Sequence, residues 1–126
     1  MTESKRQKQV SRLIQRELGD LFMRNQEWVN GEFVTITIVR VTADLGLARV
    51  YLSFFKHEKA EETMEHLEEF EVRIRHELAR RVKNQFRKLP ELQFFVDDTQ
   101  QEVERIEKIL DKLDIPEEEQ DEEEDL

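Results

Sequence analysis

The side chains whose type and spacing suggest chemistry are the lysines and arginines of residues 73–88, RIRHELARRVKNQFRK. This stretch contains seven Lys or Arg residues and one Glu. At helical spacing Arg73, Arg80 and Arg87 fall along one side. A solvated helix face is the ordinary explanation for mixed charges, but here almost all the charges have one sign. The pattern therefore favours phosphate binding, and the predicted contacts are Arg73, Arg80, Arg81, Lys83, Arg87 and Lys88.

A second basic segment lies at the start of the chain. Residues 4–16 contain five Lys or Arg residues and no acidic residue. Lys5, Arg6 and Lys8 are further candidate RNA contacts, although a charged, frayed N-terminus is the alternative explanation.

The acidic residues are concentrated at the other end of the chain. Residues 117–126 hold eight of the 30 acidic residues, which leaves 22 acidic against 20 basic residues in the rest. The net charge of −10 therefore does not describe the surface of the body. We expect residues 1–115 to form one domain and residues 116–126 to be a disordered tail, because the tail has almost nothing apolar to bury. The tail is either a solubilising appendage or a competitor of RNA for the basic residues.

Catalytic and metal-binding motifs are not evident. The chain has no cysteine, and His57, His66 and His76 lack the spacing of a metal site. The Asp97–Asp98 pair follows a predicted strand and precedes a predicted helix, which is typical of helix capping rather than acid–base catalysis. We therefore expect a protein that is not an enzyme and has no cofactor.

The expected elements begin with a helix over residues 4–25, whose apolar residues follow a three-four spacing. Residues 33–42 and 47–55 alternate like strands, and their short connection predicts an antiparallel hairpin. Val34, Ile36 and Ile38 should share one face of the first strand. In the second strand Ala48, Val50, Leu52 and Phe54 should face the core. Arg49, Tyr51 and the later Phe95 could form a surface on which bases stack, unless the last helix or a loop covers Phe95.

Helical residues should follow over 57–70 and 72–86, and the periodicity allows either one continuous helix or two helices with a kink between them. Leu89-Pro90 should end the second helix, and residues 91–97 should form a third strand. A last helix should carry the apolar stripe Val103, Ile106, Ile109, Leu110 and Leu113. This order predicts an α+β, two-layer sandwich with the helices on one face of the sheet.

Without its last helix, the order α-β-β-α-α-β resembles the bacterial, type II K-homology arrangement. Four segments resemble the ribosome-binding factor A family more specifically. They are Arg6-Gln7-x-x-Val10, residues 39–53 (VRVTADLGLARVYLS), residues 74–78 (IRHEL) and residues 90–97 (PELQFFVD). The resemblance implies a KH-like fold with an extra C-terminal helix. It also implies binding to 16S rRNA of the immature small ribosomal subunit, and a role in subunit maturation and rRNA processing.

Two departures from the family pattern concern the middle helices. Family members usually have an Ala-x-Gly kink where this chain has Phe70-Glu71-Val72, and residues 78–90 are about two residues longer than usual. The chain also has no Gly-x-x-Gly loop, so the phosphate clamp of ordinary K-homology domains is not expected.

A protein-interaction adaptor is the rival interpretation, with the basic helix binding an acidic partner and the tail a basic one. The chain has no apolar run of the length that a membrane span needs and no secretory signal pattern. We therefore expect a cytoplasmic monomer with no membrane partner.

Overall fold

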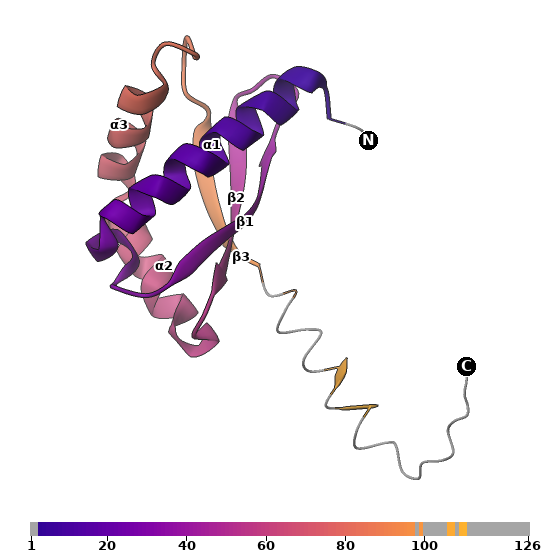
Figure 1. Ribbon diagram of the computed structural model, residues 1–126, viewed down its shortest axis with the longest axis vertical. Coiled ribbons are helices and arrows are strands. Elements are labelled where there is room, and N and C mark those ends of the chain that lie inside the picture. The colour runs from indigo at the N-terminus through magenta and orange to yellow at the C-terminus, as the bar shows by residue number, and fades with distance from the viewer. Residues whose placement is uncertain (1–2, 98, 100–105, 108, 111–126) are drawn as a thin grey trace.

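The computed structural model describes residues 3–97, 99, 106–107 and 109–110. Figure 1 shows helices packed beside a sheet whose strand order is β1-β2-β3. The elements are α1 (Lys5–Arg24), a 3-10 turn (Gln26–Val29), β1 (Val34–Val41), β2 (Leu47–Phe54), a 3-10 turn (His57–Lys59), α2 (Ala60–Glu69), α3 (Glu71–Val82) and β3 (Glu91–Val96). The predicted order α-β-β-α-α-β is confirmed. Most of the predicted last helix and all of the predicted acidic tail, residues 116–126, lie outside the described residues.

Helix α1 begins at a capping box. The Gln7 amide donates to Ser4 Oγ at 3.1 Å, and the Ser4 amide donates to Gln7 Oε1 at 2.7 Å. Each side chain therefore satisfies a backbone N–H that the first helical turn leaves unpaired. One face of the helix is buried and consists of Val10, Ser11, Ile14, Leu18, Leu21 and Phe22. The opposite face is free to present the basic residues of the segment to solvent.

The sheet has the strand order β1-β2-β3. Strands β1 and β2 pair antiparallel, as predicted, and β2 pairs parallel with β3. The predicted faces of β2 are confirmed, because Ala48, Val50, Leu52 and Phe54 are all buried.

A bulge interrupts β1 at Thr37. Ile36 pairs with Leu52, but Ile38 pairs with the next residue, Tyr51. The extra residue exchanges the two faces of the strand. Ile38 therefore lies on the same face as Tyr51 and is only partly buried. The prediction that Ile38 shares a face with Ile36 was wrong, and Val39 and Val41 are the buried residues of this part of the strand.

Helices α2 and α3 are separate, and Phe70 lies at their junction with φ −98° and ψ 11°. The break forms without a glycine, because Phe70 keeps a negative φ that any residue can adopt. Helix α3 ends at Val82, four residues before its predicted end. The amides of Gln85 and Phe86 both donate to the Val82 carbonyl, at 2.9 and 3.2 Å. The chain leaves the helix in this tight turn, and Phe86 packs partly against the core.

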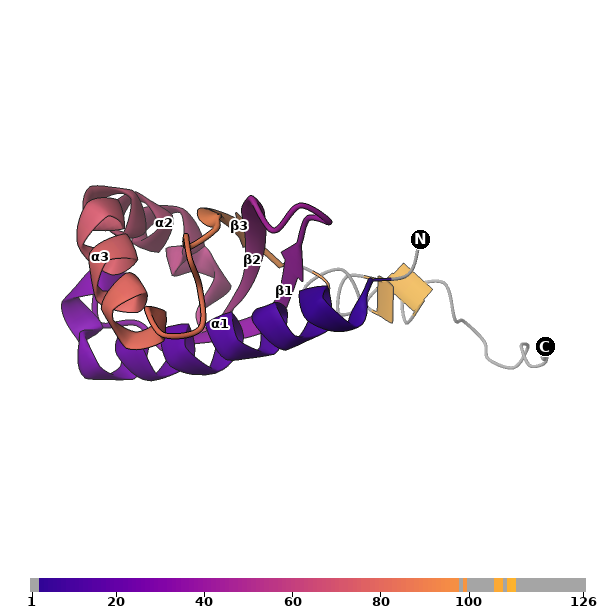
Figure 2. The same ribbon diagram turned by 90° about the horizontal axis from the view of Figure 1, so that it is seen from above.

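The helices cover one face of the sheet, which gives the predicted two-layer sandwich. Figure 2 shows α1 running below the strands, with α2 and α3 to one side of them. The core between the layers includes Ile14, Leu18, Val50, Leu52 and Leu78, each with no more than a trace of exposed surface. None of the helices described is both long and apolar enough to cross a membrane.

Candidate nucleic-acid interface

The structure divides the predicted basic residues into three groups. Arg80 and Arg81 lie in a cluster of ion pairs between α3 and α1. Arg73 lies at the start of α3. Lys83, Arg87 and Lys88 follow the end of α3 and lie at the same end of the molecule as Lys5, Arg6 and Lys8 of α1.

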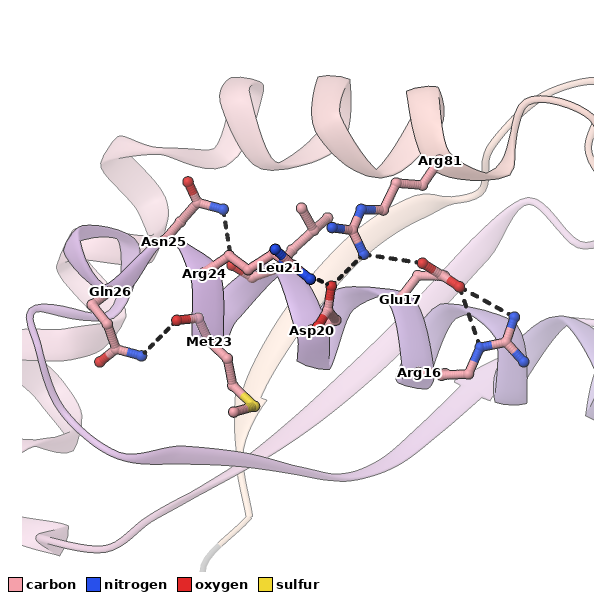
Figure 3. Close-up of polar contacts among 9 residues, drawn as sticks. All are labelled: Arg16, Glu17, Asp20, Leu21, Met23, Arg24, Asn25, Gln26 and Arg81. Carbon is pink, nitrogen blue, oxygen red and sulfur yellow. Dashed lines mark hydrogen bonds and ion pairs between the residues drawn. The ribbon is translucent and has the colours of Figure 1, made fainter.

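Arg81 connects α3 to α1. Its Nη1 donates to Asp20 Oδ2 at 2.7 Å and to Glu17 Oε1 at 3.1 Å, as Figure 3 shows. The Asp20 carboxylate raises the pKa of Arg81. In turn, hydrogen bonds from Arg24 and then Arg81 lower the pKa of Asp20. The charge of Arg81 is therefore already matched by two carboxylates of α1, which the run of like charges in residues 73–88 did not indicate.

Arg80 is also paired, because its Nη1 lies 3.3 Å from Glu77 Oε1 on the same helix. Arg73 is exposed, but it follows the acidic helix α2 by only a few residues. Since α3 spans Glu71–Val82 at about 1.5 Å per residue, Arg73 is separated from the turn after Val82 by most of the helix. The seven cations of residues 73–88 therefore do not form one continuous row.

A continuous basic surface forms between α1 and the turn after α3. We call it the basic groove. It consists of two adjoining hollows of about 350 and 410 Å³ that share Arg6 and Phe86. The first is lined by α1 and the turn, and the second by the turn and the β1–β2 connection. The cations that line the two hollows are Arg6, Arg12, Arg16, Arg87 and Lys88.

Arg6 holds the two sides of the basic groove together. Its Nη2 donates to the Gln85 carbonyl at 3.2 Å, which fixes the turn after α3 against the first turns of α1. This bond uses a neutral acceptor, and Arg6 forms no ion pair with any carboxylate of the described residues. Lys5, Lys8 and Lys83 are exposed nearby in sequence and add to the positive potential of this end.

One acidic residue, Asp44, lines the basic groove in the part of the chain that the structure describes. Its Oδ1 accepts from Thr42 Oγ1 at 2.7 Å and from the Gly46 amide at 3.0 Å. These bonds lower the pKa of Asp44, with the Thr42 hydroxyl as the first cause. The carboxylate thereby organises the β1–β2 connection, in which Leu45 has a left-handed φ of 60°.

Sequence reasoning missed Arg12 and Arg16 as groove residues. The available signal was the spacing of Lys8, Arg12 and Arg16, which recur every four residues and therefore share one helix face. Arg12 is exposed, whereas Arg16 is paired with Glu17 at 3.1 Å. Arg12 is consequently the stronger of the two added candidates.

The three residues of the possible stacking surface, Arg49, Tyr51 and Phe95, lie on the same face of the sheet. The rings of Tyr51 and Phe95 are stacked, with centroids 5.3 Å apart and an interplanar angle of 25°. Phe95 has 37% of its surface exposed, so the described residues do not cover it. Arg49 is exposed on the same strand face as Tyr51.

His57, His66 and His76 all lie in the part of the chain that the structure describes. Within the described ranges, no group of three or more His, Cys, Asp or Glu side chains is arranged to hold a metal ion. Asp97 instead accepts from Thr37 Oγ1 at 2.6 Å and from the Thr99 amide at 3.0 Å, and these bonds lower its pKa, with the Thr37 hydroxyl as the first cause.

Comparison with known proteins matches this chain to one family over most of its length. The family model described as ribosome-binding factor A matches residues 6–110. A relative of that description from Prosthecochloris aestuarii is 43% identical over 113 residues, which cover 88% of this chain and 92% of the relative. A relative of the same description from Flavobacterium johnsoniae is 38% identical over 110 residues, which cover 86% of this chain and 85% of the relative.

Solved structures agree with the sequence comparison. The crystal structure of ribosome-binding factor A from Thermus thermophilus has a TM-score of 0.61 at 27% identity, covering 71% of this chain and 94% of that one. A homology model of the Thermus thermophilus factor, fitted into a cryo-EM map of its complex with the 30S subunit, has a TM-score of 0.54 at 29% identity. The match covers 68% of this chain and 88% of the Thermus thermophilus chain. These likenesses confirm the predicted α+β, KH-like fold, and the chain belongs to the ribosome-binding factor A family.

Proposed function

We propose that this protein binds 16S rRNA of the immature small ribosomal subunit through its basic groove and assists maturation of the subunit. The observation that carries the proposal is the convergence of cations from two distant segments, residues 5–16 and 83–88, on one groove. The family assignment and the 30S complex of the Thermus thermophilus factor support the choice of partner.

The groove residues suit a phosphate backbone. Arginine presents a planar fork of N–H donors that matches two phosphate oxygens, and both Arg12 and Arg87 are exposed. Lys88 adds a point charge beside Arg87. Neutralising phosphates at these positions releases counterions, which is the main source of affinity for this kind of ligand.

The proposed activity is binding rather than catalysis. By holding rRNA of the small subunit in one arrangement, the protein would favour processing by other factors without itself breaking a bond. We further propose that the protein acts in the cytoplasm. We also propose that it acts as a monomer, because one copy presents the whole basic groove.

Co-sedimentation with purified small ribosomal subunits tests this function. The triple variant Arg12→Glu, Arg87→Glu, Lys88→Glu reverses three groove charges. The matched control, Arg24→Glu, Lys56→Glu, Arg73→Glu, makes the same change in net charge at exposed positions outside the groove. We expect the groove variant to remain in the supernatant and the control to pellet with the subunits. Equal pelleting of both would contradict the proposal, and selective loss in the control would move the site away from the groove.

A further inference from the structure

The open face of the sheet takes no part in the basic groove. The helices pack on the opposite face, as Figure 2 shows. Pairing across the strands arranges the side chains of the open face in two neighbouring rows. One row is apolar and consists of Ile38, Tyr51 and Phe95, and the next is polar and consists of Arg40, Arg49 and Gln93. We call these two rows the sheet platform.

The apolar row presents two aromatic rings in nearly parallel planes. The planes of Tyr51 and Phe95 differ by 25°, and the ring centroids are 5.3 Å apart. A flat ligand can extend such a stack, because offset stacking is a favoured arrangement of aromatic groups. Ile38 lies opposite Tyr51 on β1 and adds apolar surface. This row therefore suits a planar, aromatic ligand.

The polar row contains an arrangement that costs stability in the free protein. Arg40 and Arg49 lie directly opposite each other on β1 and β2, and like charges in such a pair repel each other. Among the described residues Arg49 forms no ion pair, and Arg40 forms a single one, with Glu3 at 3.9 Å. Both arginines are exposed. A local rule that is broken without a compensating contact is typical of a ligand site.

The rings and the arginines suit the same class of ligand, the bases of single-stranded RNA. Unpaired bases stack on aromatic rings and on guanidinium planes, and arginine N–H groups can donate to acceptors on base edges. Two residues along a strand span about 7 Å, so one base or two neighbouring bases can contact both rows. The acidic side chains of this face lie outside the rows, since Glu91 pairs with Leu47 and Asp97 is bonded to Thr37.

We propose that the sheet platform binds unpaired bases of RNA, which stack on its two rings and accept hydrogen bonds from its two arginines. This inference rests on the proposed binding of RNA but not on the basic groove. The polar row lies next to the β1–β2 connection, which also lines the basic groove. One strand of RNA can therefore place its phosphates in the groove and its bases on the platform.

The predicted C-terminal stripe is the other candidate occupant of this face. Its described residues, Ile106, Ile109 and Leu110, are themselves 49–58% exposed. Phe95 keeps 37% of its surface exposed, so the described part of the chain leaves the platform open. An aliphatic stripe would also leave the pair of arginines unexplained, whereas RNA accounts for both rows.

Fluorescence anisotropy with the full-length protein and a labelled deca-adenosine RNA tests this inference. The matched probe is an abasic decamer, which keeps the phosphates and lacks the bases. We expect deca-adenosine to bind at least about tenfold more tightly than the abasic decamer, because stacked bases add affinity that phosphates do not supply. Equal affinities for the two probes would overturn the proposal. A failure of the basic groove is distinguishable, because it alters the salt dependence of binding rather than the preference for bases.

Removal of the rings locates the site. Tyr51→Val with Phe95→Val keeps residues that suit a strand and should weaken binding of deca-adenosine by about tenfold or more, with no change for the abasic decamer. The matched control, Phe33→Val with Phe55→Val, removes two exposed rings whose planes meet at 76°. The control should keep the wild-type preference, and circular dichroism checks the fold of both variants. Equal effects of the two pairs would overturn the assignment.

Substitution of the arginines tests the platform without disturbing the packing of the rings. Arg40→Gln with Arg49→Gln should weaken binding of deca-adenosine by at least about fivefold, and it should not lower the melting temperature, since it relieves a like-charge pair. Arg24→Gln with Arg73→Gln makes the same change in net charge and should leave binding nearly unchanged. Equal binding by these two variants would overturn the role of the arginines. If the variant without rings lost thermal stability but kept its affinity for RNA, the face would belong to the C-terminal stripe and the proposal would fail.

Discussion

Salt dependence offers a quantitative test of the basic groove. Seven cations at this end of the molecule form no ion pair among the described residues: Lys5, Arg6, Lys8, Arg12, Lys83, Arg87 and Lys88. If each neutralises one phosphate of single-stranded RNA, the slope of log Kobs against log salt should be about −0.7 × 7, or about −5. Between about 50 and about 200 mM salt, affinity should then fall about a thousandfold.

The variant Arg12→Gln, Arg87→Gln, Lys88→Gln removes three of these cations. Four remain, so the slope should become about −3 and the loss of affinity over the same salt range about 50-fold. Anisotropy of a labelled single-stranded RNA, measured across that range, gives both slopes. The matched variant Arg24→Gln, Lys56→Gln, Arg73→Gln should keep the wild-type slope. An unchanged slope in the groove variant, or an equal change in both variants, would refute the assignment of phosphate contacts to the groove.

Four further predictions concern the fold and the ends of the chain. Val50→Asp should abolish the thermal unfolding transition, because a carboxylate at this fully buried position has no partner; a normal melting curve would contradict the core assignment. Leu78→Ala should lower the free energy of unfolding by about 2–5 kcal/mol in urea titrations, since Leu78 is completely buried, and a loss below about 1 kcal/mol would show that the site collapses around the smaller residue. Thr37→Val should raise the pKa of Asp97 in an NMR titration. The lowered pKa of Asp97 stabilises the native state at pH values above the ordinary 3.8. This contribution disappears as pH falls through the folded-state pKa. An unchanged pKa of Asp97 in the variant would show that the Thr37 bond is not its cause. Truncation after Ile115 should raise RNA affinity at low salt relative to the full-length chain. The difference should shrink as salt rises, because salt screens the tail carboxylates of the full-length chain. Equal affinities of the two chains at low salt would reduce the tail to a solubility element.

Much of the fold was predictable because its signals are local. The apolar spacing of α1 and the alternation of β2 each follow from a single element facing one core. The bulge at Thr37 was not predictable in the same way, since Ile36, Ile38, Val39 and Val41 are all apolar and allow either register. The pairing register across β2 settles which of them face the core, and that is a property of two strands rather than one.

The site was harder to predict than the fold. Periodicity placed residues 72–86 on one helix, but α3 ends at Val82, so Arg87 and Lys88 lie well beyond its end. Composition identified both basic segments, yet it gave no sign that Arg6 would meet Gln85, 79 positions away in the sequence. Nor could it show that Arg81 would be matched by Glu17 and Asp20, because an ion pair between α1 and α3 depends on how the helices cross.

The central claim is that RNA of the small subunit lies in the basic groove. Ultraviolet cross-linking of the protein to RNA in growing cells, followed by mass spectrometry of the cross-linked peptides and sequencing of the attached RNA, tests it most directly. The account predicts cross-links within residues 5–16 and 83–89, attached to 16S rRNA. Cross-links confined to α2 and β3, or attached mainly to RNA from outside the small subunit, would contradict it.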